Sequence, residues 1–179
     1  MQIQCAYRGT SCTYVLRDGQ FLICSRNRIR DNEEDGKSDW YVKMAKKFDV
    51  EKNMRAYGMN IGVQGEIVGP SINKNMLKLK EADFRVFNIY LIDKGRYATY
   101  DECEEIRKEL KLNSVPLLYK GKFKEEWNTV DNMMAYAESI QYYEGACAEG
   151  IVVKNIDPLR RISFKVVSNR YLFQFKHKR

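Results

Sequence analysis

Short β-type runs recur along the whole chain, and they restrict the fold more than any other feature. The run 60–69, NIGVQGEIVG, alternates so that one face of a strand would pack at Ile61, Val63, Gly65 and Ile67, and FRVFNIYLID (84–93) is a second strong strand. The runs EGIVVKNI and ISFKVVS close the chain, joined by a turn at Asp157-Pro158. Helical segments separate these runs without a regular βαβ rhythm. The sequence therefore predicts an α+β fold with largely antiparallel sheets.

Weaker signals complete the β part of the prediction. The segments 12–17 and 21–25 flank a turn at Arg17–Gln20, which is a hairpin signal. The segment 114–119, SVPLLY, is strand-like. The acidic, turn-rich segment 31–39, DNEEDGKSD, is predicted to be a mobile loop.

Three segments have the apolar spacing of helices. The first begins at Trp40, and its apolar positions are Tyr41, Met44, Ala45 and Phe48. The second is predicted to begin with Asp101 as its cap and Glu104 as the partner in a capping box. Its apolar positions are Cys103, Ile106 and Leu110. The third spans 129–140, and its predicted core positions are Val130, Met133, Met134 and Ala137.

The length and the apolar pattern limit the class of protein. The 179 residues contain no repeat, low-complexity stretch or Pro/Gly linker, so residues 1–179 are predicted to form a single domain. No apolar run approaches the roughly 20 residues of a membrane-spanning helix. The N-terminus, MQIQCAYRGTSC, lacks the basic and apolar regions of a secretory signal. We therefore expect a cytoplasmic protein without a membrane partner.

The cysteines and the histidine exclude two classes of site. The five cysteines are scattered without a C-x-x-C spacing, and the one histidine is His177 near the end of the chain. A Cys/His zinc site has too few ligands, and a Ser-His-Asp or Cys-His catalytic site lacks a base. The cysteines are expected to be reduced, buried thiols.

The charge is concentrated at the C-terminal end. The formal net charge is +7, and the stretch from Arg160 to Arg179 contains seven basic residues and no acidic one. Such an excess suits phosphate or nucleic acid. A solvated basic tail is an equally good interpretation of the charge alone.

Four β-type runs contain polar residues where a buried charge needs a reason. A strand glutamate beside a glycine, as in Glu66 with Gly65, would leave room for a ligand. A phenylalanine such as Phe87 could stack on a base, Glu149 could bind a divalent metal, and lysines at strand ends could neutralise phosphate. Together they suggest a site for a nucleoside phosphate. Taken singly, each has a simpler reading, such as an edge ion pair or, for Phe87, a core position.

The order of these four runs resembles a known family. The patterns G-E-x-x-G, F-x-x-F-x-I, E-G-x-V-x-K and F-K-V resemble, in sequence, the motifs of the covalent nucleotidyltransferases, which include ATP-dependent RNA and DNA ligases and RNA capping enzymes. The resemblance is strongest to the RNA ligase branch and extends from about Gly9 to about Leu172. It is carried by the segments VQGEIVGP, FRVFNIY, EGIVVK and SFKVVSNRYL. The resemblance implies an ATP-grasp-like nucleotidyltransferase fold of largely antiparallel sheets with flanking helices.

The resemblance also implies a role for each motif residue. Glu66 corresponds to a residue that grips the ribose of ATP or AMP, Phe87 to one that stacks on adenine, and Arg26 to one that touches the nucleotide or the RNA end. On the phosphate side, Lys165 corresponds to a lysine on the α-phosphate and Lys154 to a second basic contact near it. Glu149 resembles the glutamate that binds Mg²⁺ or Mn²⁺.

The first motif departs from the family's pattern. Aligned through Gly9, the position of the nucleophilic lysine is occupied by Ala6 and that of the following aspartate by Arg8. Cys5 stands where a glutamate that reads adenine is expected, and no lysine occurs before Lys37. A methyl group cannot attack phosphorus, so a lysyl-adenylate is not expected at Ala6. We expect a chain truncated at its N-terminus, by a degenerate gene, a truncated reading frame or an altered start. In the last motif, a second lysine of the family is replaced by Val167.

Two functions remain open on these observations. The first is an RNA-ligase-type domain for RNA repair that joins 5′-phosphate and 3′-hydroxyl RNA ends without forming the lysyl-adenylate itself. The second is a non-catalytic remnant that binds nucleotide or RNA. A separate RNA-binding domain or protein is a further candidate partner. An unrelated α+β interaction protein would require four ordered motifs to coincide.

Overall fold

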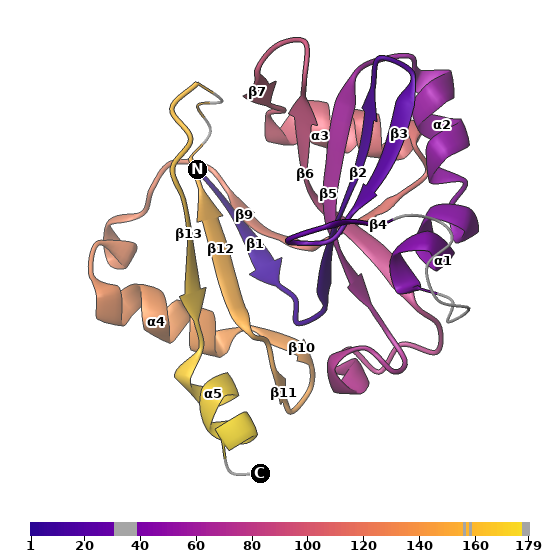
Figure 1. The fold of residues 1–179 in the computed structure, drawn as a ribbon. Coiled ribbons are helices and arrows are strands. Elements are labelled where there is room, and N and C mark those ends of the chain that lie inside the picture. The colour runs from indigo at the N-terminus through magenta and orange to yellow at the C-terminus, as the bar shows by residue number, and fades with distance from the viewer. Residues whose placement is uncertain (31–38, 156, 158, 177–179) are drawn as a thin grey trace. The chain divides into compact units, whose positions relative to one another are not determined.

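The computed structural model describes residues 1–30, 39–155, 157 and 159–176. Its contacts divide the chain into two compact units. We call Met1–Arg8 with Val115–Arg179 the terminal unit, and Gly9–Ser114 the inserted unit. The chain thus leaves the terminal unit after one strand and returns to it about a hundred residues later (Figure 1). Residues 31–38 of the predicted mobile loop lie outside the described residues.

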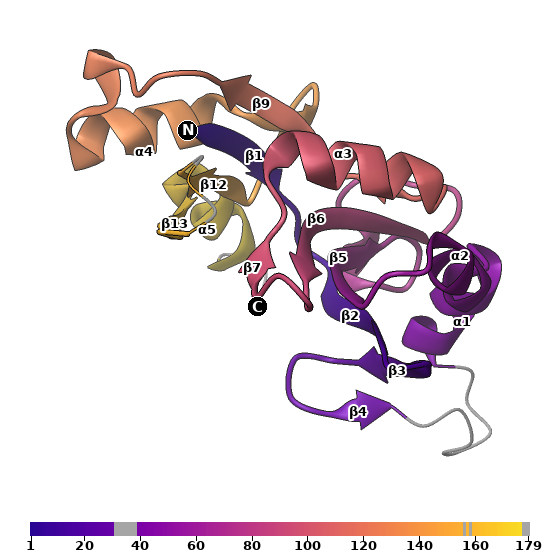
Figure 2. The ribbon, with the colours of Figure 1, turned by 90° about the horizontal axis from the view of Figure 1, so that it is seen from above.

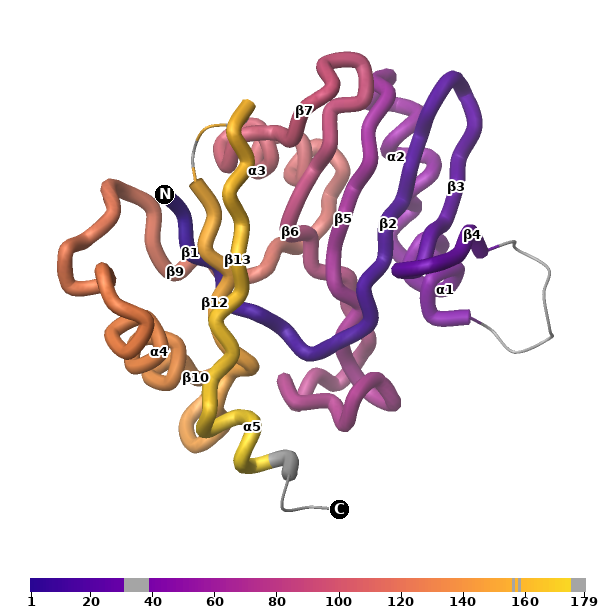
Figure 3. The backbone as a smooth tube through the Cα atoms, turned by 60° about the vertical axis from the view of Figure 1, so that its left-hand side comes forward, coloured from indigo at the N-terminus to yellow at the C-terminus, as the bar shows by residue number. Residues whose placement is uncertain are grey.

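The inserted unit is built on one seven-stranded sheet, and among its described strands only the β6–β8 pair is parallel. Its strands are β2 (Thr10–Arg17), β3 (Gln20–Cys24), β4 (Ile29–Arg30), β5 (Ile61–Val68), β6 (Asp83–Leu91), β7 (Arg96–Tyr97) and β8 (Asn113–Ser114). The order is β4-β3-β2-β5-β6-β7, and Figure 3 shows β3, β2, β5 and β6 side by side. The predicted hairpin is confirmed: Asp18 and Gly19 both have positive φ, as a tight two-residue turn requires.

Three helices pack on one side of this sheet (Figure 2). They are α1 (Trp40–Lys47), α2 (Val50–Tyr57) and α3 (Tyr100–Glu109), and a short 3₁₀ turn, η1 (Asn73–Asn75), follows β5. Met44 and Ala45 are buried in the core as predicted, with Tyr41 and Phe48 packed at its margin. The alternation predicted for β5 is also confirmed, because its four expected core positions are buried.

The start of α3 differs from the prediction. The cap is Thr99, not Asp101, and its capping-box partner is Glu102, not Glu104. The Glu102 carboxylate accepts from the Thr99 N–H at 2.8 Å and also receives two hydrogen bonds from Arg96. Glu104 instead pairs with Arg107 within the helix. Two residue pairs had the required spacing, and the observed pair has the threonine that a capping box prefers and a glutamate that is also held by Arg96. The predicted stripe of Cys103, Ile106 and Leu110 is buried as expected.

The terminal unit contains a four-stranded antiparallel sheet in the order β13-β12-β1-β9. Its strands are β1 (Gln2–Ala6), β9 (Leu117–Lys120), β12 (Gly150–Lys154) and β13 (Ser163–Val167), and β10 (Gln141–Tyr143) and β11 (Ala146–Cys147) form a separate hairpin. The helices are η2 (Glu125–Trp127), α4 (Val130–Ser139) and α5 (Asn169–Lys176). Its small core joins Ile3, Ile151 and Val153 of the sheet to Trp127, Met133 and Ala137.

Two predicted features of the terminal unit need correction. Val130 is 80% exposed instead of packed, because it is the first residue of α4 and the core face of that helix is set by Met133 and Ala137. The strand-like segment 114–119 is broken at Pro116, since proline lacks the N–H that a continuous strand would donate. Pro116 instead accepts a hydrogen bond from the Cys5 N–H at 3.0 Å.

The antiparallel β12–β13 pair at the C-terminal end is confirmed, although part of its connection lies outside the described residues. The five cysteines are free thiols, four of them buried, as predicted. Among the described helices, none combines the length and apolar character of a membrane span. The α+β class with largely antiparallel sheets is confirmed.

Candidate functional site

One face of the terminal sheet gathers the polar motif residues of that unit. In the register of β1, β12 and β13, Gln4 pairs with Val152, and Val152 pairs with Lys165. Because side chains alternate along a strand, Ala6 and Lys154 lie on this same face. The apolar core residues of these strands occupy the opposite face. The position expected for the nucleophile therefore shares a face with both motif lysines.

Glu149 and Lys165 form an ion pair on the terminal unit. The Lys165 Nζ lies 2.7 Å from the Glu149 Oε1, and the two side chains are 40% and 20% exposed. The backbone of Glu149 is fixed as well, because its N–H donates to the Tyr142 hydroxyl at 3.0 Å and its carbonyl accepts from the Ser168 N–H at 2.9 Å. The carboxylate is thus held in one place while it remains accessible to solvent.

The sequence suggested that a glycine beside a strand glutamate leaves room for a ligand, but Gly150 has a different role beside Glu149. A side chain at Gly150 would overlap the Val166 carbonyl of the neighbouring strand, and its φ of 149° disfavours other residues. At Gly65, beside Glu66, a side chain would overlap the Phe84 ring. Both glycines therefore allow close approach between parts of the protein, and the space that they leave is not free for a ligand.

Lys154 is almost completely buried, with 6% of its surface exposed. Its ammonium donates to the Oε1 of Gln4, which is itself buried. An amide oxygen partly compensates the cost of burying this charge. The pair fixes Lys154 next to β1, the strand that ends at Ala6.

The altered first motif is tied into the terminal unit. Ala6 is 4% exposed, and its carbonyl accepts from the Tyr142 hydroxyl at 2.8 Å. The Arg8 guanidinium donates to the Tyr171 hydroxyl of α5 at 3.0 Å. Burial, together with the nearby charge of Glu149, raises the pKa of the Cys5 thiol to about 12. Cys5 therefore stays protonated near neutral pH and is a poor substitute nucleophile.

In the inserted unit, Glu66 lies on the face of the sheet opposite to α1, α2 and α3, since its neighbours Gly65 and Ile67 face the core. Its carboxylate accepts from the Gly9 N–H at 3.1 Å. A side chain at Gly9 would overlap the Ile67 carbonyl and the Glu66 side chain, so only glycine fits there. Gly9, through which the first motif was aligned, thus contacts the glutamate that the resemblance leads us to expect at the ribose.

A β-bulge places Phe87 on the face that carries Glu66. Gln64 pairs with Asn88 and Gly65 with Val86, so Phe87 is the extra residue of β6. Val86 and Ile89 on either side remain in the core, and Phe87 and Asn88 are both half-buried on the opposite face. The simpler reading of Phe87 as a core residue is therefore wrong, because the bulge changes the alternation.

Arg26 lies apart from these two residues. It is exposed in the turn that connects β3 to β4, which the Ser25 N–H closes by donating to the Arg28 carbonyl at 2.8 Å. Strand β2 separates β3 from β5, so Arg26 and Glu66 lie on different parts of the sheet.

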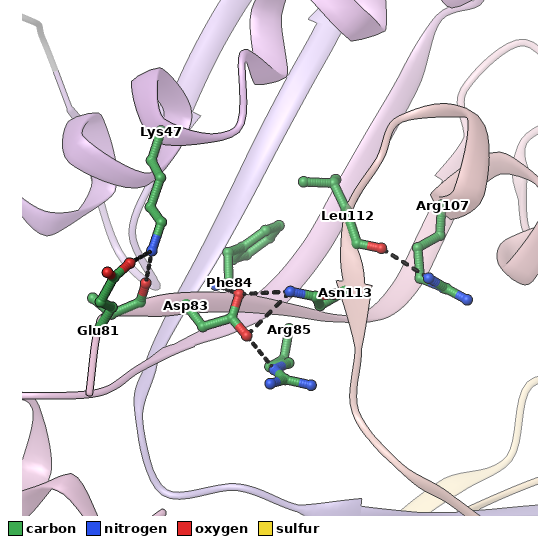
Figure 4. A network of polar contacts seen from close by, with 9 residues as sticks. Lys47, Glu81, Asp83, Phe84, Arg85, Arg107, Leu112 and Asn113 are labelled. Carbon is green, nitrogen blue, oxygen red and sulfur yellow. Dashed lines mark hydrogen bonds and ion pairs between the residues drawn. The ribbon is translucent and has the colours of Figure 1, made fainter. Parts of the chain in front are cut away.

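A polar network fixes the beginning of β6, the strand that carries Phe87 (Figure 4). The Asn113 side chain donates to both oxygens of Asp83, at 3.0 and 3.2 Å, and Arg85 forms an ion pair with the same carboxylate. Lys47 of α1 donates to the Ala82 carbonyl at 2.7 Å. The Asp83–Arg85 pair is local, but the contacts of Asn113 and Lys47 were not indicated by the sequence, because they join residues 30 and 35 positions apart.

The described residues contain no group of three or more His, Cys, Asp or Glu side chains that could hold a metal ion alone. A divalent metal at Glu149 would therefore need other ligands. Mg²⁺ commonly uses one or two carboxylates together with waters and the phosphates of a substrate. One accessible carboxylate next to a lysine fits this kind of ligand set.

Comparison with known proteins decides the family. The family model "RNA ligase" matches residues 8–167. This chain belongs to the RNA ligase family. A Naegleria gruberi RNA ligase mutant with ATP and Mn matches with a TM-score of 0.88 and 28% identity, over 99% of this chain and 51% of that chain. The same ligase with PPi matches with a TM-score of 0.88 and 28% identity, over 99% of this chain and 52% of that chain. A mutant with AMP and Mn matches with a TM-score of 0.87 and 28% identity, over 99% of this chain and 52% of that chain.

The chain thus spans about half the length of these solved RNA ligases. No curated protein matches it. The match confirms the expected nucleotidyltransferase fold, and the agreement over nearly the whole chain extends to β1, where the first motif is altered.

Two residues of the site were missed by sequence reasoning. Gln4 supports Lys154, and Tyr142 bonds to both Ala6 and Glu149. A polar residue within the short strand QIQCA could have indicated Gln4. Nothing in QYYEG distinguishes Tyr142, because its partners are distant in the sequence.

Proposed function

We propose that this RNA-ligase-family domain binds ATP or AMP with a divalent metal and seals RNA 5′ ends that already carry AMP. It does not form its own lysyl-adenylate. One observation carries the proposal: Ala6, where the resemblance leads us to expect the nucleophilic lysine, shares a sheet face with Lys165, and Lys165 forms an ion pair with Glu149. A methyl group at this position cannot serve the first step, whereas the lysine and the glutamate could serve the last step.

Adenylate formation needs a nucleophile that the residues around Ala6 do not supply. The Cys5 thiol is protonated near neutral pH. The Lys154 ammonium is buried against Gln4, and the Lys165 ammonium is engaged by Glu149. Both side-chain nitrogens already hold a partner, so attack on the α-phosphate by either lysine would first require that contact to break.

Sealing of an adenylylated end needs no nucleophile from the protein. The 3′-hydroxyl oxygen attacks the 5′-phosphorus of the RNA, a phosphodiester bond forms, and the bond to AMP breaks. AMP leaves and the hydroxyl proton passes to solvent. Lys165, with Lys154 near the same face, would stabilise the charge that develops on the phosphates. A metal ion held by Glu149 would supply further charge neutralisation.

The inserted unit would supply the nucleoside contacts. Glu66 presents a carboxylate for the ribose hydroxyls, and Phe87 presents a half-buried ring for adenine beside it. Arg26 is exposed and free to reach a phosphate or the RNA end from its turn. Solved structures of the Naegleria gruberi ligase hold ATP with Mn and AMP with Mn, which supports the proposal that this chain binds an adenine nucleotide and a divalent metal.

The wider biological role is part of the same proposal. We propose that the domain acts in RNA repair in the cytoplasm, on 5′-phosphate and 3′-hydroxyl ends, with Mg²⁺ or Mn²⁺. A separate RNA-binding domain or protein is the partner that we propose for it. The basic residues between Arg160 and Arg170 offer a surface for RNA phosphates.

The test is a single-turnover assay on a nicked RNA whose 5′ end is already adenylylated. We expect weak sealing that requires Mg²⁺ or Mn²⁺, that is abolished by Glu149→Ala and that is retained by Glu144→Ala. Glu144 is an exposed glutamate of the same unit and serves as the matched control. Equal, background-level sealing by the wild type and Glu149→Ala would overturn the proposal.

The absence of the nucleophile at Ala6 also favours the second function, a non-catalytic remnant that binds nucleotide or RNA. This alternative predicts RNA binding that weakens steeply with added salt, without sealing of adenylylated ends. The sealing assay therefore separates the two.

A further inference from the structure

The Tyr142 hydroxyl connects two parts of the terminal unit that carry expected site residues. It donates to the Ala6 carbonyl at 2.8 Å and accepts from the Glu149 N–H at 3.0 Å. A phenol hydroxyl can donate one hydrogen bond and accept others, so it can hold both neighbours at the same time.

The ring of Tyr142 is held as firmly as its hydroxyl. It makes an edge-to-face contact with the Tyr7 ring, with centroids 5.5 Å apart and an interplanar angle of 76°. Burial raises the pKa of Tyr142, so its hydroxyl remains a neutral donor at physiological pH. Tyr142 belongs to β10, whose partner β11 lies outside the four-stranded sheet. The hydroxyl is therefore a bridge from this hairpin to the first motif and to Glu149.

We propose that Tyr142 is a positioning residue that fixes the Glu149 carboxylate relative to β1 and so sets the affinity of the site for a divalent metal. The inference rests on the proposed role of Glu149. The backbone of Glu149 is held at its carbonyl by Ser168 and at its N–H by Tyr142, and its carboxylate is held by Lys165. Of these three restraints, the one from Tyr142 also holds Ala6.

The substitution Tyr142→Phe removes this link and keeps the ring against Tyr7. It leaves the Ala6 carbonyl and the Glu149 N–H without this partner in a part-buried place, so the backbone there can shift. Loss of a group that orients a metal ligand typically weakens metal binding about 10- to 100-fold. The effect should therefore fall on the metal dependence more than on the nucleotide or the RNA.

The experiment measures sealing of adenylylated RNA by the wild type and Tyr142→Phe over a range of Mn²⁺ concentrations. We expect the half-saturating Mn²⁺ concentration to rise about tenfold or more, as for other groups that orient metal ligands, with much of the rate recovered at saturating metal. The matched control is Tyr136→Phe, which removes a half-buried hydroxyl from α4 and should leave the Mn²⁺ dependence unchanged.

A second measurement does not depend on sealing. Binding of Mn²⁺ to each variant, with AMP present, is followed by electron paramagnetic resonance of the free ion. Weaker Mn²⁺ binding by Tyr142→Phe than by Tyr136→Phe supports the positioning role even where the wild type does not seal RNA. A uniform loss of rate at every Mn²⁺ concentration, or unchanged Mn²⁺ binding, would overturn it. Absence of Mn²⁺ binding to the wild type would instead overturn the role of Glu149.

Discussion

The two units differ in how far they keep the residues that the RNA ligase resemblance leads one to expect. In the inserted unit, Glu66 and Phe87 are both present on the sheet face opposite to the helices. In the terminal unit, the Glu149–Lys165 ion pair is present, but Ala6 replaces the expected lysine. Under the proposed function, this difference would separate nucleotide binding from the first chemical step. The chain would keep its nucleotide and phosphate contacts and would lose covalent adenylate transfer.

The largest expected effect is the complete absence of a covalent intermediate. Incubation of the protein with labelled ATP and Mg²⁺ should leave no label on the protein after denaturation, because Ala6 cannot attack phosphorus. The measurement is autoradiography of a denaturing gel. A labelled band that survives denaturation and is lost on acid treatment would show that another residue acts as the nucleophile. The terminal unit would then not differ from the inserted unit in the way described. Ala6→Lys alone should restore little, because Arg8 still replaces the expected aspartate.

A second prediction compares the cores of the two units. We propose that residues 1–179 form a single cooperative domain, because the inserted unit interrupts the chain of the terminal unit. Ile61 and Ile151 are each fully buried, one in each core. Ile61→Ala and Ile151→Ala should each lower the free energy of unfolding by about 2–5 kcal/mol.

Both variants should unfold in one transition, measured by urea denaturation with circular dichroism and tyrosine or tryptophan fluorescence. Trp127 reports on the core of the terminal unit. Two separated transitions, with only one shifted by each variant, would show that the units unfold independently.

A third prediction concerns nucleotide binding by the inserted unit. ATP should raise the melting temperature by mass action. Phe87→Ala should weaken ATP binding about tenfold, since stacking on an aromatic ring is worth about 1–3 kcal/mol. The control is Phe123→Ala, which removes an exposed phenylalanine of the terminal unit and should leave the ATP-dependent shift intact. Calorimetry gives the two affinities. If millimolar ATP neither raises the melting temperature of the wild type nor gives a calorimetric signal, nucleotide binding by Glu66 and Phe87 is excluded.

The smallest expected effect concerns acid stability of the inserted unit. The Arg96 guanidinium beside Glu102 lowers the pKa of that carboxyl to about 2. A lowered pKa means that the stabilisation is present above the ordinary value and is lost as the pH falls towards 2. Glu102→Gln should cost roughly 0.3–1 kcal/mol at pH 7, as for an acidic residue in the first turn of a helix.

The cost of Glu102→Gln should shrink progressively below pH 4, measured by urea unfolding at several pH values. A cost that stays constant from pH 7 to pH 3 would mean that the charge on Glu102 does not contribute. Glu105→Gln, which changes an exposed residue of the same helix, is the control.

Local patterns predicted three of the five described α-helices and most of the longer strands, but they did not predict β1, α2 or α5, or where the elements end. The hairpin at Asp18-Gly19, the alternation of β5 and the stripe of α3 each depend on residues close in sequence, and each was predicted correctly. The cap of α3 was not, because two residue pairs had the same spacing and the glutamate of the observed pair is also held by Arg96. Val130 was misplaced because spacing alone does not say where a helix face meets its core.

The sequence by itself determined the α+β class, the order of the motifs, the family and the absence of a lysine at position 6. Only the tertiary structure decided which motif residues lie together. Strand register brings Ala6, Lys154 and Lys165 to one face, and the bulge in β6 turns Phe87 towards the face of Glu66. Tyr142 meets Ala6 across 136 positions of sequence. Periodicity reports on neighbours within one element, whereas pairing between distant strands depends on how the whole chain packs.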